Sequence, residues 1–251
     1  MEEAKPCSTP AEVGLNLSKD DDSKFVDPTF YRSFVGSLMY LTATRPDITY
    51  GVSLISKFIE QPKKTHWEAG KRILRYVRGT LGDGLYYQKA NNSKVLGYCD
   101  SDWAASVDDS KSTSENVFFV GSCAIKWISK KQQVVALSTA EAKYISLSLA
   151  SCQALWITRV LEDLKHAAKE SPIIYCDSKS MIALTKYPVF HGKSKHIRIK
   201  YHFIRDLLKK GEVVIQHCES QDQIGDIFTK PLRSDIFKEL KNKLGTRKSL
   251  A

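Results

Sequence analysis

The stretch VLGYCDSDWA, residues 95–104, is typical of a buried strand that runs into a carboxylate at its end. A second stretch of the same kind, PIIYCDSKS, covers residues 172–180. Asp100 and Asp177 come directly after the apolar part of each run. Because α/β sheets gather their ligands at strand ends near a topological switch, we expect these two carboxylates to share one site.

The sequence around these two strands alternates between strand and helix patterns. Two β-rich runs, SENVFFVG (114–121) and CAIKWIS (123–129), are joined through Gly121-Ser122, which predicts a hairpin. A long helix is predicted over about 139–164. The later patterns predict a helix over 178–186, a helix over 196–210, a strand over 212–218, and a terminal helical segment over 222–245 that Pro231 interrupts. The fold class is therefore α/β, a mixed sheet with helices on its faces.

Two further acidic residues open predicted helices, Glu141 in LSTAEAKY and Asp226 in DQIGDIFTKPL. Carboxylates from distant segments that meet in this way suit a hard cation such as Mg²⁺. Two such ions about 4 Å apart can hold a phosphodiester for in-line hydrolysis. The sequence therefore predicts a catalytic and metal-binding set made of Asp100, Glu141, Asp177 and Asp226.

The chain of 251 residues has a net charge of +10, and this charge is unevenly distributed. Residues 1–27 carry 3 basic and 7 acidic groups (net −4), residues 28–93 carry 10 and 4 (net +6), and residues 94–251 carry 25 and 17 (net +8). A basic body that concentrates carboxylates at one site suits a polyanionic substrate held by metal ions. The alternative is a solvated surface with an excess of lysine.

Six cysteines show no C-x-x-C pair, and they are expected to be reduced and mostly buried. No apolar run reaches the length of a membrane span, and the N-terminus lacks the apolar stretch of a signal peptide. We therefore expect no membrane partner and a location in the cytoplasm or nucleus.

Composition divides the chain into four parts. Residues 1–27 form a polar, weakly ordered leader, residues 28–92 a small helical region, residues 93–245 the α/β domain, and residues 246–251 a tail. In the third helix of the helical region, Trp67, Gly70, Leu74 and Val77 are predicted to form the apolar stripe.

Two basic clusters are candidates for binding nucleic acid. The first lies on the third helix and consists of Lys64, Lys71, Arg75 and Arg78. The second lies in HGKSKHIRIKYHF and consists of Lys193, Lys195, His196 and Arg198. For the first cluster, an ordinary solvated face of an amphipathic helix is an equally good interpretation. For the second, a zinc site is disfavoured because no cysteine lies nearby in sequence.

Several stretches of the chain together resemble a known protein family. The stretches HWEAGKRILRYVRGT (66–80), GYCDSDWA (97–104), SKKQQVVALSTAEAKY (129–144) and DQIGDIFTKPL (222–232) are similar to the C-terminal end of copia-type retrotransposon Pol polyproteins. The resemblance covers residues 28–245. It implies the thumb or connection region of a reverse transcriptase, followed by a ribonuclease H (RNase H)-like domain. The Tyr-x-Asp-Asp motif of the polymerase is absent, so we expect no DNA synthesis.

The resemblance also implies partners and cofactors. The domain would hydrolyse the RNA strand of RNA–DNA hybrids, or bind other duplex nucleic acid, using two Mg²⁺ ions or Mn²⁺ in their place. It would work beside the upstream reverse transcriptase domain of the same polyprotein, and in virus-like particles if the element is expressed. Asp100, Asp177 and Asp226 match the family's aspartates, and Asp102 matches an accessory aspartate with a supporting role.

The glutamate of the site is where this chain departs from the family. The family pattern Ser-x-x-Glu-Ala-Glu-Tyr is Ser138-Thr-Ala-Glu141-Ala-Lys143-Tyr144 here. Ser138 and Glu141 form a capping box, which gives Glu141 a structural role. If position 143 faces the site, a cation replaces a ligand and pairs with Asp100 or Asp177. If Glu141 reaches inward instead, the site survives. The chain departs from the family at four further positions. The family usually has Arg where Ser110 stands, Gly where Glu115 stands, an acidic residue where Arg198 stands and Ala where Gly225 stands.

Two functions therefore remain open. The first is an RNase H that cuts the RNA strand by two-metal catalysis. The second is a catalytically inactive remnant that still binds nucleic acid.

Overall fold

The computed structural model describes residues 4–89, 94–166, 168, 170–186 and 198–248, and these residues form two compact units. The first unit consists of residues up to Tyr86, Ser106–Ser110 and the segment from Lys230 onward. The second consists of Tyr87–Ala105 and Lys111–Thr229.

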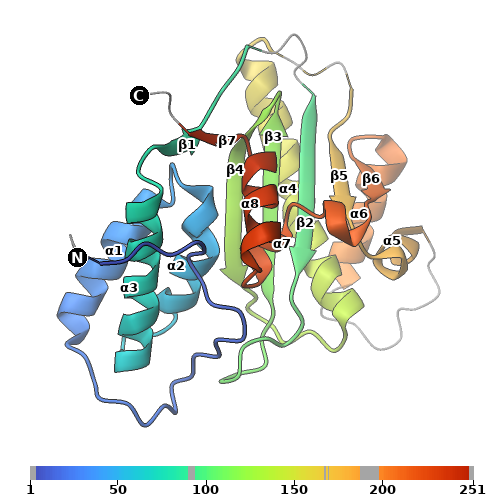
Figure 1. Cartoon of the computed structure of the whole chain (residues 1–251). Coiled ribbons are helices and arrows are strands. Elements are labelled where there is room, and N and C mark those ends of the chain that lie inside the picture. Colours follow the sequence, from blue (N-terminus) through green and yellow to red (C-terminus); the bar gives the residue numbers. More distant parts are fainter. Residues whose placement is uncertain (1–3, 90–93, 167, 169, 187–197, 249–251) are drawn as a thin grey trace. The chain divides into compact units, whose positions relative to one another are not determined.

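The second unit is a five-stranded mixed sheet with helices packed on it (Figure 1). Its strands are β2 (Val95–Ser101), β3 (Thr113–Val120), β4 (Cys123–Lys131), β5 (Ile173–Cys176) and β6 (Val214–His217). Its helices are α4 (Thr139–Asp163), α5 (Lys179–Lys186), α6 (Arg198–Lys210), the 3-10 turn η4 (Ser220–Asp222) and α7 (Asp226–Thr229). These elements agree with the predicted order, and the fold class is confirmed.

The sheet has the order β4-β3-β2-β5-β6, which places the two acidic strands side by side. Strand β2 is antiparallel to β3 and parallel to β5. The predicted hairpin at Gly121 joins β3 to β4, and Gly121 has a φ of +72°, which suits glycine in a tight turn. Because parallel neighbours end at the same edge, β2 and β5 deliver their aspartates together.

Helix α4 packs on β2 and β3 and forms the centre of the main core. Its buried residues in this core include Ala142, Leu147 and Ala150. Gly97 on β2 gives the space that Phe118 needs, because a Cβ at position 97 would lie 2.5 Å from the Phe118 ring. The short helix α7 packs against β2, β3 and β4. Ser129 of β4 donates a hydrogen bond of 2.9 Å to the Phe228 carbonyl of α7.

The first unit is mainly helical. Its elements are α1 (Pro28–Leu41), the 3-10 turn η1 (Pro46–Ile48), α2 (Thr49–Ser56), α3 (Lys64–Gly79), α8 (Ser234–Lys243) and the two-stranded sheet of β1 (Asp83–Leu85) and β7 (Thr246–Lys248). Asp27 caps α1 by accepting a hydrogen bond of 2.9 Å from the amide of Phe30.

The predicted apolar stripe of α3 is wrong by about one residue. The residues that α3 buries are His66, Gly70, Ile73 and Tyr76, whereas Trp67, Leu74 and Val77 are only half-buried. Hydropathy ranks His66 and Tyr76 below their neighbours, but both are buried because their polar atoms find partners from other segments.

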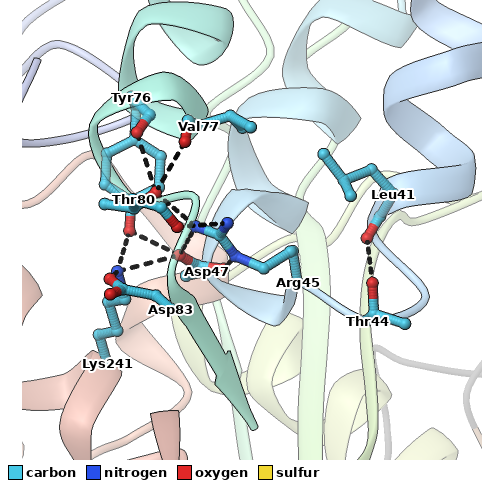
Figure 2. A network of polar contacts seen from close by, with 9 residues as sticks. All are labelled: Leu41, Thr44, Arg45, Asp47, Tyr76, Val77, Thr80, Asp83 and Lys241. Carbon is cyan, nitrogen blue, oxygen red and sulfur yellow. Dashed lines mark hydrogen bonds and ion pairs between the residues drawn. The ribbon is translucent and has the colours of Figure 1, made fainter. Parts of the chain in front are cut away.

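A buried polar network supplies the partners of Tyr76 (Figure 2). The Arg45 guanidinium donates to both carboxylate oxygens of Asp47, at 2.9 and 2.8 Å. The Tyr76 hydroxyl donates to Asp47 Oδ2 at 2.5 Å. Lys241 Nζ donates to the Tyr76 hydroxyl and to Asp83 Oδ2, both at 2.6 Å. Burial alone would raise the pKa of Asp47, but the cations Arg45 and Lys241 hold this pKa below its ordinary value.

The network explains why the last segment of the chain belongs to the first unit. Lys241 lies on α8, and β7 pairs with β1, so residues 230–248 close the helical unit. The boundaries predicted from composition place residues 93–245 in one domain; in the structure the chain leaves the second unit after Thr229.

The leader packs on the helical unit through its described residues. Ala11 and Leu17 are each 8% exposed. The ring of His66 is stacked on Phe58 with centroids 3.8 Å apart. His66 Nδ1 accepts a hydrogen bond of 3.0 Å from the amide of Lys63, so Nε2 carries the proton and contacts the Ser18 carbonyl at 3.1 Å.

This arrangement holds His66 in its neutral form and predicts an acid-sensitive fold. Burial lowers the pKa of His66 and Lys63 adds to this effect, whereas Ser18, Asp21 and Asp108 oppose it. The unfolded chain then binds the proton more tightly, so the free energy of unfolding decreases as the pH falls through about 6.5. We expect urea unfolding at pH 5 and pH 8 to show this loss. A His66→Asn variant should lack this part of the pH dependence, and an unchanged profile would contradict the assignment.

Two further observations bear on the expectations from composition. All six cysteines are free thiols. Among the described residues, no helix combines the length and the apolar character that crossing a bilayer requires.

Candidate active site

Two copies of the tetrapeptide Tyr-Cys-Asp-Ser stand side by side at the candidate site. They are Tyr98–Ser101 on β2 and Tyr175–Ser178 at the end of β5. Tyr98 is the register partner of Tyr175, and their rings stack with centroids 5.1 Å apart. Asp100 and Asp177 each lie two residues beyond this register pair, so both carboxylates come from the same end of neighbouring parallel strands. This repeat is visible in the sequence and would have predicted the register.

The ammonium group of Lys143 lies between these two carboxylates. Lys143 Nζ is 2.8 Å from Asp100 Oδ1, which makes them an ion pair. It also donates a hydrogen bond to Asp177 Oδ1. The Lys143 side chain is only 14% exposed. Burial alone would lower the pKa of Lys143, but Asp100 and then Asp177 outweigh it and raise this pKa, so the lysine is charged.

Polar side chains fix the start of α4 on the sheet and so direct Lys143 to the strand ends. Gln132 donates a hydrogen bond of 3.0 Å to the Ala142 carbonyl and one of 2.8 Å to Ser114 Oγ on β3. The Ser146 hydroxyl donates to the Asp100 carbonyl at 2.6 Å and lies 3.0 Å from the Glu115 carbonyl. Gln132 and Ser146 were not predicted as positioning residues, because neither type signals long-range contacts in a single sequence.

Glu141 caps the helix. Ser138 Oγ accepts a hydrogen bond of 3.2 Å from the amide of Glu141, and Glu141 Oε2 accepts one of 3.0 Å from the amide of Leu137. Glu141 is 4% exposed. Two residues along a helix correspond to a rotation of about 200°, so Glu141 and Lys143 point in different directions. The structure thus follows the alternative in which position 143 faces the site.

Asp226 approaches the same region as the first residue of α7. Gln223 Nε2 donates a hydrogen bond of 3.1 Å to the Cys99 carbonyl, and Gln223 Oε1 accepts one of 3.0 Å from the amide of Gly225. A Cβ at position 225 would lie 3.3 Å from Asp100 Cβ. The residue before Asp226 is therefore packed directly on Asp100, and Asp226 itself is half-buried.

Asp102, for which the resemblance implies a supporting role, makes a contact between two strands. Asp102 Oδ1 accepts a hydrogen bond of 2.6 Å from the amide of Thr113, where β3 begins. This bond ties the end of β2 to the start of its antiparallel partner.

The residues present do not fit a pair of divalent cations. Among the described residues, no group of three or more His, Cys, Asp or Glu side chains is placed to hold a metal ion. Asp100 and Asp177 already share a cation, the Lys143 ammonium, which would repel Mg²⁺.

The predicted basic clusters are only partly described. On α3, Lys64 and Arg78 are exposed and Lys71 and Arg75 are half-buried. Lys71 pairs with Glu68 of the same helix at 2.9 Å. In the second cluster, Arg198 is the first residue of α6, and Lys193, Lys195 and His196 lie outside the described residues.

Comparison of the sequence with known proteins finds Pol polyproteins of transposons among its relatives. No protein-family model matches the chain. It is 40% identical over 245 residues to the retrovirus-related Pol polyprotein from transposon RE2 of Arabidopsis thaliana, covering 98% of the chain and 17% of the relative. The counterpart from transposon TNT 1-94 of Nicotiana tabacum is 38% identical over 252 residues, covering 98% and 19%. The chain thus spans less than one fifth of the length of these relatives.

Solved structures give two further similarities. A foamy viral protease-reverse transcriptase in complex with double-stranded DNA matches with a TM-score of 0.50 and 12% identity, covering 80% of this chain and 33% of that one. LC11-RNase H1, isolated from compost, matches with a TM-score of 0.40 and 15% identity, covering 60% of this chain and 97% of that one. At such low identity, similarity concerns the fold alone.

Proposed function

The chain belongs to the Pol polyproteins of copia-type retrotransposons, and we propose that its second unit is an RNase H-type domain that binds nucleic acid without cutting it. The RNase H-like fold of this unit supports the first part of the proposal. The second part rests on one observation, the ammonium group of Lys143 between the carboxylates of Asp100 and Asp177.

Charge is the physical reason for the loss of cutting. Hydrolysis of a phosphodiester in this type of site depends on divalent cations held by several carboxylates. Where the family pattern has a glutamate, this chain has Lys143, so one negative charge is replaced by one positive charge. The combined charge of Asp100, Asp177 and residue 143 is therefore −1, whereas it would be −3 with a glutamate at position 143. Glu141 does not compensate, because its carboxylate is bound to the amide of Leu137.

Binding of nucleic acid is supported by the charge of the chain. The net charge is +10, and polyanions are attracted to such a surface. We propose RNA–DNA hybrid or other duplex as the ligand; the foamy viral relative is described in complex with double-stranded DNA. The proposed contacts in the first unit are Lys64, Lys71, Arg75 and Arg78, and those in the second are Lys193, Lys195, His196 and Arg198. The remaining reverse transcriptase of the same polyprotein is the proposed protein partner.

The wild-type chain is expected to bind a labelled RNA–DNA hybrid and leave it intact. In 10 mM Mg²⁺ or Mn²⁺, RNA products should stay at the level of a protein-free reaction, while a bacterial RNase H cuts the same substrate completely. Fluorescence anisotropy should show binding. The logarithm of the association constant should fall linearly with the logarithm of the salt concentration. If wild type shows metal-dependent cleavage and an Asp100→Asn variant abolishes it, the proposal that this domain does not cut nucleic acid is wrong. Absence of binding at low salt would overturn the binding function.

A further inference from the structure

The leader of the chain lies along the basic helix α3 of the same unit. We call its residues 4–24 the leader strap. The Arg72 guanidinium donates to Thr9 Oγ1 at 3.1 Å and lies 3.4 Å from Glu12 Oε2. The Arg78 guanidinium donates to the carbonyl of Ala4. The guanidinium groups of two of the five basic residues of α3 therefore contact the strap.

A second set of contacts lies at the start of α3. Asp21 accepts a hydrogen bond from the Thr65 hydroxyl, and its carbonyl accepts one from Lys63 Nζ. The Thr65 bond, followed by those from Ser23, lowers the pKa of Asp21 to about 2. The carboxylate of Asp21 is thus ionised throughout the physiological pH range, directly beside the N-terminus of α3.

The charges of the two segments are opposite in sign. The leader strap carries 4 acidic and 3 basic groups, a net −1. Helix α3 carries Lys64, Lys71, Arg72, Arg75 and Arg78 against Glu68, a net +4. The strap thus places one carboxylate, that of Glu12, and two neutral oxygens against the cations Arg72 and Arg78, where a nucleic-acid backbone would place phosphates.

The strap is held in a way that allows exchange. Ala11 and Leu17 anchor it through burial, at 8% exposure each. Its ion pair to α3 is exposed, with a Glu12 side chain that is 64% exposed. Exposed ion pairs are weak and are screened by salt, so a polyanion of higher charge density can displace them without unfolding the helices.

We propose that the leader strap is an internal competitor that covers part of the basic face of α3 and weakens the binding of duplex nucleic acid until the duplex displaces it. The inference rests on the proposed function, because it assumes that α3 contacts the duplex. It goes further by assigning the acidic leader an autoinhibitory role within the same unit.

The test compares variants of the 251-residue chain in which two acidic side chains are neutralised, either in the strap or elsewhere. The strap variant is Glu12→Gln with Asp21→Asn, and the matched control is Glu162→Gln with Glu212→Gln in the second unit. In low salt, the strap variant should bind a 20-base-pair RNA–DNA hybrid about 5- to 10-fold more tightly than wild type, and the control less than about 2-fold more tightly. The difference should shrink as salt rises. Equal tightening in both variants, or none in the strap variant, would overturn the strap's role.

A third variant separates failure of the strap from failure of the proposed function. Lys64→Gln with Arg75→Gln removes two charges of α3 other than Arg72 and Arg78, whose guanidinium groups contact the strap, and it should weaken binding in every background. If it weakens binding while the strap variant matches wild type, the strap proposal falls and the binding function stands. If wild type does not bind and the α3 variant changes nothing, the proposed function itself falls.

A protease measurement covers the case in which the strap variant unfolds. In wild type, addition of hybrid should speed tryptic cleavage at Lys5, Lys19 and Lys24. These lysines are already exposed, but displacement frees the backbone around them from its contacts with the helices. Leader cleavage that stays unchanged at saturating hybrid would contradict displacement.

Discussion

A Lys143→Glu variant is expected to gain Mg²⁺-dependent cleavage of the RNA strand in RNA–DNA hybrids. The gain over wild type should be on the order of 10³-fold, since one electrostatic group in a hydrolytic site contributes about 10²- to 10³-fold and this change both removes a repulsive charge and adds a ligand. The measurement is the rate of product formation from an end-labelled hybrid at several Mg²⁺ concentrations.

The geometry gives the reason for this gain. Lys143 Nζ already reaches Asp100 and Asp177, so a carboxylate at position 143 would join both and bring the local charge to −3. Three carboxylates without a cation repel one another in a partly buried site, so the variant should also be less stable than wild type without metal. Mg²⁺ should restore its melting temperature, whereas wild type should not respond.

Three controls separate this explanation from others. Lys143→Gln removes the positive charge without adding a ligand and should stay inactive. Asp100→Asn in the Lys143→Glu background should abolish the gained activity. Glu141→Gln in the same background should retain it, because Glu141 caps α4. If Glu141→Gln eliminates cleavage, the cap assignment is wrong and Glu141 is a metal ligand.

A Lys241→Met variant is expected to destabilise the first unit by about 3–5 kcal/mol, the usual cost of removing one partner of a buried ion pair. The Lys241 side chain is 9% exposed, and its ammonium group lies 2.6 Å from Asp83 Oδ2 and 3.3 Å from Asp47 Oδ2 (Figure 2). Without the Lys241 ammonium group, the Asp83 carboxylate loses its cationic partner, and the Asp47 carboxylate keeps Arg45 as its cationic partner. The measurement is the free energy of unfolding from urea titration, followed by a probe in the helical unit.

The same helix provides a matched control. Lys243 is also on α8, but its pair with Glu239 is a surface i, i+4 contact of 3.0 Å. Lys243→Met should therefore cost only about 0.3–0.5 kcal/mol. Equal effects of the two variants would contradict the buried network as the anchor of α8.

Most of the α/β unit could be predicted from local patterns. The two Tyr-Cys-Asp-Ser runs, the turn at Gly121 and the helix start at Ser138 carry their structure in neighbouring residues, and each lies where the sequence indicates. The pairing of Lys143 with Asp100 and Asp177 was one of two alternatives, and the choice between them required coordinates. Helix rotation relative to the strand ends is a tertiary property.

The remainder could not be predicted because it depends on partners far apart in the chain. His66 is buried because Ser18 reaches its ring, and Tyr76 because Asp47 and Lys241 do. Hydropathy assigns such residues to the surface, which shifted the predicted stripe of α3. In the same way, Lys241 of α8 gives no local sign of its partner Tyr76, 165 residues away.

The most direct test is a crystal structure of the wild-type chain grown with Mn²⁺, with anomalous diffraction used to locate the metal. We expect density for the Lys143 ammonium between Asp100 and Asp177 and no anomalous peak there. A Mn²⁺ peak bound by these two carboxylates, with Lys143 turned away from them, would contradict the account.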